Sequence, residues 1–198
     1  MTPKDYALLA LKCYADAPTF GAEDSAARAV VYGDVVAIPG TNNISCDLAD
    51  MQAIATSTPL GMVHDGFWET WCLMANNLMP LSPEAVTGHS LGGDLALIYA
   101  GMLCLAGKPP KAVYAFEPAH VSCDTILREL FIKHGVFVYV SHHGHDIVPC
   151  IARLFEKWQH PGDVTELCQT DYPYPHISFD AVRNIKDHLM DGVIAALG

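Results

Sequence analysis

Short β-branched runs alternate with longer amphipathic stretches along this chain, and this alternation predicts strands that alternate with helices. The runs at 29–32 and 35–38 are separated by Gly33-Asp34, which predicts a tight hairpin. Further strands are expected at 85–86, at 111–116 and at 135–140, the last of these apolar enough to be buried on both faces. Strands that alternate with helices pair in parallel, so we expect an α/β fold with a mostly parallel central sheet and helices on both faces.

Apolar residues at helical spacing predict the covering helices. The expected helices lie at 5–15, at 68–79, from Leu91 onward for fifteen residues, at 124–134 with Asp124 as N-cap, and from about Ser178 to the end. The segment between 42 and 62 has no strong core pattern. There we expect a short helix at 46–55 and then a loop at 56–61.

Length and composition limit the class of protein. A chain of 198 residues with 51% hydrophobic and 17% charged residues suits a single folded domain over 1–198 and excludes a disordered chain. No apolar run reaches the roughly twenty residues that cross a bilayer. The apolar N-terminal stretch is interrupted by Lys12, so we interpret it as a first helix and not as a signal peptide.

Charge and cysteine content limit the partners and the compartment. The formal net charge of −11 disfavours nucleic acid and anionic lipid surfaces as partners, so a small neutral substrate fits better. The seven cysteines form no Cys-x-x-Cys pair, and we expect buried free thiols in a reducing, cytoplasmic location, with release by another route left open. The oligomeric state stays open.

The segment Gly88-His89-Ser90-Leu91-Gly92 has the Gly-x-Ser-x-Gly pattern of a nucleophile elbow, between a short apolar run and a long helical one. The glycines allow a strand and a helix to meet in a sharp turn that exposes the serine at the helix N-terminus. The alternative is a helix start with Ser90 as an ordinary N-cap. The predicted strand before and helix after favour the elbow.

An acid and a base are expected further along the chain. Asp146 follows the predicted strand at 135–140, at the edge of the sheet where α/β proteins place ligand-facing groups. The neighbouring His142, His143 and His145 lack the spacing of metal ligands, and we interpret them as part of a polar loop. Chain order leaves His176 and His188 as candidates for the general base.

Together these motifs resemble the class 3, fungal-type lipases and their bacterial relatives, which are α/β-hydrolases. The resemblance spans nearly the whole chain. It rests on Gly40-Thr41, Val63-His64-Asp65-Gly66-Phe67, Gly88-His89-Ser90-Leu91-Gly92-Gly93, Asp146-Ile147-Val148-Pro149 and Asp187-His188-Leu189.

The resemblance implies a role for each of these residues. It makes Ser90 the nucleophile, Asp146 the acid and His188 the base, with an oxyanion hole from Leu91 and Thr41. It implies hydrolysis of a small ester or lipid without a cofactor or a metal. A lid is expected over about 42–60, and because that segment has no Trp and contains two aspartates, short to medium acyl chains are expected.

Two other functions remain open from the sequence alone. The first is a phospholipase or acyltransferase that acts on membrane lipids. The second is a hydrolase fold without activity that is used for binding. The negative charge disfavours the first alternative. The presence of serine, aspartate and histidine in the expected chain order disfavours the second.

Overall fold

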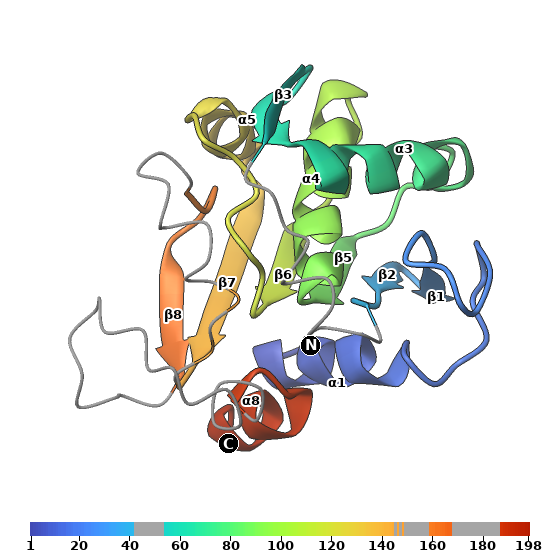
Figure 1. The fold of residues 1–198 in the computed structure, drawn as a ribbon, viewed down its shortest axis with the longest axis vertical. Helices are drawn as coiled ribbons and strands as arrows, with labels where there is room; N and C mark the ends of the chain where they lie inside the picture. The colour runs from blue at the N-terminus through green and yellow to red at the C-terminus, as the bar shows by residue number, and fades with distance from the viewer. Residues whose placement is uncertain (42–53, 145, 147, 149–158, 168–186) are drawn as a thin grey trace.

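The computed structural model describes residues 1–41, 54–144, 146, 148, 159–167 and 187–198. Its centre is a six-stranded sheet in the order β1-β2-β5-β6-β7-β8 (Figure 1). Strands β1 and β2 are antiparallel, and the other neighbours are parallel. The strands are β1 Val30–Tyr32, β2 Val35–Ile38, β5 Ala85–His89, β6 Ala112–Phe116, β7 Phe137–His143 and β8 Val164–Leu167.

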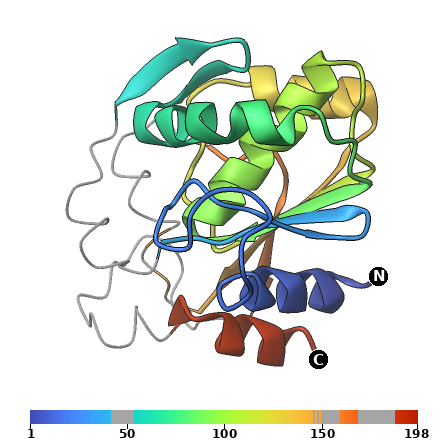
Figure 2. The ribbon, with the colours of Figure 1, turned by 90° about the vertical axis from the view of Figure 1, so that its right-hand side faces the viewer.

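Helices cover both faces of this sheet, as Figure 2 shows. One layer holds α3, α4 and α5, and the opposite layer holds the first and last helices, α1 and α8. The bounds are α1 Pro3–Lys12, α3 Asp65–Leu78, α4 Leu91–Leu105, α5 Ile126–His134 and α8 Met190–Ala196. This mixed, mostly parallel sheet between helices confirms the expected α/β fold with helices on both faces.

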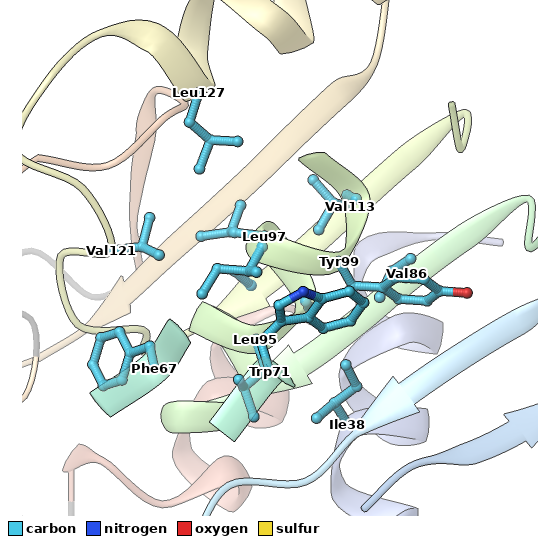
Figure 3. Close-up of a cluster of buried hydrophobic side chains, with 14 of the residues drawn as sticks. Ile38, Phe67, Trp71, Val86, Leu95, Leu97, Tyr99, Val113, Val121 and Leu127 are labelled. Carbon is cyan, nitrogen blue, oxygen red and sulfur yellow. The ribbon is translucent and has the colours of Figure 1, made fainter. Parts of the chain in front are cut away.

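The main core lies between α4 and its neighbours. Helix α4 is buried on nearly every side because β5 and β6 lie on one side of it and α3 and α5 on the others. Leu95 and Leu97 pack there with Trp71 from α3 (Figure 3). The hydroxyl of Tyr99 donates to the Leu78 carbonyl over 2.8 Å, so this buried polar group is satisfied. The core therefore fixes the start of α4, which carries the candidate nucleophile.

Several predicted elements are confirmed. The hairpin at Gly33-Asp34 and the helix that follows Ser90 lie where the sequence placed them. The first helix, predicted at 5–15, is present but spans Pro3–Lys12. Helix α3 begins at Asp65, three residues earlier than predicted. The start of a last helix near Ser178 falls outside the described residues, within which the final helix begins at Met190.

The predicted loop at 56–61 was wrong. Residues Ala55–Thr58 (β3) and Gly61–His64 (β4) form an antiparallel hairpin apart from the main sheet. The turn residue Leu60 is fully buried, which gives the hairpin an apolar anchor that its Ser and Thr content concealed. The predicted helix at 46–55 lies largely outside the described residues, and its last residue belongs to β3.

Strand β7 also departs from the prediction. It continues to His143, so His142 and His143 belong to a strand and not to a polar loop, while His145 lies outside the described residues. Phe137 at its start is 55% exposed, and β8 pairs only with the later part of β7, from Val140 onward. Burial on both faces was therefore wrong for the first half of β7.

Two smaller expectations need correction. Thr125, not Asp124, is the N-cap of α5, although the Asp124 carboxylate accepts a hydrogen bond from the Ile126 N–H over 3.0 Å. Of the cysteines in the described residues, Cys13 and Cys104 are buried free thiols as expected, whereas Cys72 is exposed. No helix among the described residues has the length and apolarity to cross a membrane.

Candidate active site

Ser90 lies at the turn between β5 and α4. Its backbone has φ 57° and ψ −132°, a conformation that non-glycine residues rarely adopt. Its N–H donates to the Phe116 carbonyl over 2.9 Å, and its side chain makes no capping hydrogen bond to α4. This strained turn is that of a nucleophile elbow, and the N-cap alternative does not describe it.

The two glycines of the elbow are needed for close packing. A Cβ on Gly88 would overlap the Gly92 carbonyl, and a Cβ on Gly92 would overlap the Ile38 carbonyl at the end of β2. Strand β5, helix α4 and strand β2 therefore meet in backbone contact around Ser90. The sequence predicted this close approach.

Asp146 and His188 are in direct contact. The Nδ1–H of His188 donates to Asp146 Oδ2 over 2.6 Å, and both side chains are 1% exposed. The other Asp146 oxygen, Oδ1, accepts the Val148 N–H over 2.9 Å. Burial alone would raise the pKa of Asp146, but the charge and hydrogen bond of His188, and further bonds from Glu117 and Val148, lower this pKa below its ordinary value. Asp146 is therefore held as a carboxylate.

The second nitrogen of His188, Nε2, is the candidate proton acceptor, since Nδ1 bonds Asp146. Nε2 is buried and accepts no hydrogen bond within the part of the chain that the structure describes. With the proton on Nδ1, Nε2 carries the lone pair that a general base requires. No direct Ser90 to His188 hydrogen bond is present among these residues, and in unliganded hydrolases this bond is often long.

His89 connects the nucleophile turn to His188. Its Nε2–H donates to the backbone carbonyl of His188 over 2.8 Å, and the two rings lie 4.7 Å apart. Its Nδ1 accepts the hydroxyl of Tyr14 over 2.8 Å, and Tyr14 Oη in turn accepts the Gly40 N–H over 2.8 Å. This chain of hydrogen bonds joins the loop after β2, the elbow and the segment before α8.

Burial, together with the nearby His188, lowers the pKa of His89 to about 3. His89 is therefore neutral at ordinary pH, with one nitrogen as donor and the other as acceptor. The sequence analysis gave no role to His89 or Tyr14, because neither spacing nor chain order links them. Only the fold brings these positions, 75 residues apart, into contact.

The predicted oxyanion-hole residues flank Ser90. Leu91 is the first residue of α4, so its N–H belongs to the first turn, which has no acceptor within the helix. Thr41 is half-buried and directly follows Gly40, whose added Cβ would lie 3.0 Å from the Ser90 Cβ. Both backbone positions are thus close to the nucleophile.

Glu117 is a buried acidic residue that the sequence analysis missed. It directly follows β6, is 0% exposed and has φ 51°. A carboxylate oxygen of Glu117, one of Asp146 and a ring nitrogen of His188 lie within 4.8 Å of one another. Among the described residues, no other set of three histidine, cysteine or acidic side chains brings its polar atoms so close together. A buried acid at the carboxyl end of a strand, beside a proline, is the signal that could have identified it.

The other histidine candidates have different partners or lie outside the described residues. The Nδ1–H of His143 donates to the Asp187 backbone carbonyl over 2.9 Å, next to His188. His142 Nε2 lies 3.0 Å from His160 Nε2, both rings are buried, and the ring of His120 stacks on that of His160. His176 and the predicted lid residues 42–53 lie outside the described residues, and residues 55–60 of the predicted lid belong to the β3–β4 hairpin.

Comparison with known proteins gives one family and a set of related structures. The model of the family Lipase (class 3) matches residues 35–155. A search among curated proteins found no match. The lipase Lip2 from Yarrowia lipolytica is 20% identical with a TM-score of 0.64, and the match covers 84% of this chain and 79% of that one.

Two further structures extend this picture. The lipase from Rhizopus microsporus var. chinensis is 21% identical with a TM-score of 0.60, and 71% of this chain matches 56% of it. The mono- and diacylglycerol lipase from Aspergillus oryzae is 25% identical with a TM-score of 0.59, and 70% of this chain matches 55% of it. The chain thus spans little more than half the length of these two proteins and shares their fold.

Proposed function

The chain belongs to the class 3 lipase family, and from this membership and the buried Asp146 to His188 hydrogen bond we propose that it hydrolyses carboxylic esters through an acyl-enzyme on Ser90. The observation that carries the proposal is this hydrogen bond beside a strained serine turn. A buried carboxylate that fixes the imidazole tautomer is what a serine nucleophile needs from its base. The family supports a lipid or ester as the substrate.

The proposed reaction proceeds in two halves. Ser90 Oγ attacks the ester carbonyl while His188 Nε2 accepts the hydroxyl proton, and the Asp146 carboxylate stabilises the imidazolium. The N–H groups of Leu91 and Thr41 donate to the oxyanion. The alcohol leaves with the proton from His188. Water then adds to the acyl carbonyl and gives one proton to His188. As the bond between the acyl carbon and Ser90 Oγ breaks, His188 passes this proton to Oγ, so the acid leaves and the Ser90 hydroxyl is restored.

A fluorophosphonate probe tests the nucleophile directly. We expect one covalent adduct per chain, located on Ser90 by peptide mass spectrometry, and parallel loss of activity toward chromogenic esters. The exposed Cys72 thiol is the matched control, because a probe that reacts without selectivity would also label it. An adduct elsewhere, or full activity after complete labelling, contradicts the proposal.

For the acyl group we propose short to medium chains. The segment 42–60 contains Asp47 and Asp50 and no Trp, so it offers little apolar surface to an oil interface. In a chain-length series of esters, we expect higher kcat/KM for soluble members than for emulsified triglycerides. We also expect little change in rate as the substrate passes its solubility limit. A steep rise at the interface contradicts this preference.

A further inference from the structure

The backbone of Glu117 is fixed between the nucleophile turn and β7. Its N–H donates to the Ser141 carbonyl over 2.9 Å, and the carbonyl of the preceding Phe116 accepts the Ser90 N–H over 2.9 Å. Its φ of 51° lies in the left-handed region, where the backbone of a non-glycine residue is strained. Glycine would fit this position without strain, so the glutamate side chain needs another explanation.

The Glu117 carboxyl lies in the same buried site as Asp146. These two groups and the His188 ring present atoms within 4.8 Å of one another, and all three residues are buried. When His188 is neutral, two carboxylates so close together in a buried site repel each other strongly, so we expect one of the two carboxyls to keep its proton. The Val148 N–H and the His188 Nδ1–H hold the negative charge on Asp146. The proton therefore belongs to Glu117.

We propose that Glu117 is a positioning residue that remains protonated and donates its O–H to the Asp146 carboxylate. Asp146 then accepts from three donors, which come from the end of β6, from its own loop and from the segment before α8. The catalytic consequence rests on the proposed ester hydrolysis. Glu117 fixes the direction of the carboxylate, and this carboxylate fixes the imidazole of His188.

The surroundings of Glu117 define the expected pH dependence. The titratable groups near it in the described residues are Asp146 and His188, with His89 behind His188 and Asp94 bonded to the backbone two residues further on. The hydrogen bond from Glu117 is one of the causes that lower the pKa of Asp146. Its loss raises this pKa, so the acid limb of kcat/KM, which reports the coupled Asp146 and His188 pair, moves to higher pH.

Two substitutions separate the donor from the fold. Glu117→Gln keeps an N–H donor of similar size, and Glu117→Gly removes the donor while fitting the left-handed backbone. We expect kcat of Glu117→Gln within about threefold of the original chain and an unmoved acid limb. We expect kcat of Glu117→Gly to fall about ten- to hundredfold with little change in KM, and its acid limb to move upward.

Asp94→Asn is the matched control. Asp94 is also a buried carboxyl, on α4, and its Oδ2 accepts the Ala119 N–H over 3.1 Å. Burial raises its pKa well above the ordinary value, which favours the protonated form of this carboxyl as well. Its contact with Ser90 is made by the backbone N–H, and its carboxyl bonds no proposed catalytic group among the described residues, so Asp94→Asn should keep both kcat and the acid limb. Circular dichroism of each variant verifies the fold.

Infrared spectroscopy tests the proton without any turnover. At neutral pH the original chain should show the carbonyl band of protonated carboxyls, part of which disappears in Glu117→Gln and another part in Asp94→Asn. If part of this band disappears in Glu117→Gln but the original chain hydrolyses no ester, the shared proton is supported and only the proposed ester hydrolysis is overturned. If the original chain is active, an unchanged carbonyl band in Glu117→Gln overturns the inference. So does a Glu117→Gly variant that keeps the original kcat and acid limb.

Discussion

Ser90→Ala and His188→Ala are each expected to lower kcat for a short soluble ester by about three to six orders of magnitude, and the double variant to be scarcely slower than either. The proposed nucleophile, base and acid act as one unit, so removal of one member also removes most of what the other two contribute to the rate. Ser90→Ala should change stability little, because the Ser90 side chain lies at the turn and not within the apolar core. His188→Ala should be less stable, because it leaves the buried Asp146 carboxylate without the His188 Nδ1–H donor, so its rate is measured under conditions in which the variant is folded. Initial rates with a chromogenic ester, corrected for spontaneous hydrolysis, measure the effect.

His176→Ala is the control for this experiment. Chain order permits either His176 or His188 as the base, and the structure places only His188 against Asp146, since His176 lies outside the described residues. We expect His176→Ala to keep most of the activity. If His176 proves essential and His188 dispensable, the base must be reassigned and the contact of His188 with Asp146 would serve packing alone.

Gly92→Ala is expected to have the largest effect on stability. Its Cβ would overlap the backbone of Ile38 and Pro39, and backbone atoms in a sheet cannot move aside as a flexible side chain can. We expect the free energy of unfolding to fall by about 3 kcal/mol or more, measured by urea denaturation. The same reason applies to Gly88→Ala, whose Cβ would meet the backbone of Gly92.

Gly66→Ala provides the comparison. Gly66 lies in the first turn of α3, and its added Cβ would come no closer than 3.6 Å to the His64 ring, an ordinary contact. Alanine is favoured over glycine in helices by up to about 1 kcal/mol, so the free energy of unfolding should stay the same or rise. Equal losses at Gly66 and Gly92 would show that backbone overlap is not the reason for the glycines of the elbow.

The features that the sequence predicted correctly are those that local chemistry dictates. The hairpin at Gly33-Asp34 and the helix after Ser90 depend on turn residues and apolar spacing within a few positions. The close packing at the glycines around Ser90 was also predicted from a local pattern, Gly-x-Ser-x-Gly. Asp146 was placed from the end of a strand, a rule about parallel sheets that needs no side-chain coordinates.

The features that the sequence analysis missed depend on which strands become neighbours. Glu117 meets Asp146 because β6 pairs with β7 in a register that sets Phe116 opposite Ser141. Tyr14 reaches His89 because α1 packs beneath β5. The β3–β4 hairpin was missed because its polar residues favour a loop, whereas the buried Leu60 anchors it as a strand pair. No periodicity within a single element reports such contacts.

The packing of the first helix against the last has a consequence for the order in which the molecule forms. Helices α1 and α8 lie side by side on one face of the sheet, and Lys4 Nζ donates to the Gly198 carbonyl over 2.7 Å (Figure 1). His89 and His188, which this packing brings together, are 99 residues apart in the chain. Contacts of such long range form late, after the local ones around Trp71 and α4. A refolding chain should therefore bury the core around Trp71 first. It should recover ester hydrolysis only after α1 and α8 have packed against each other.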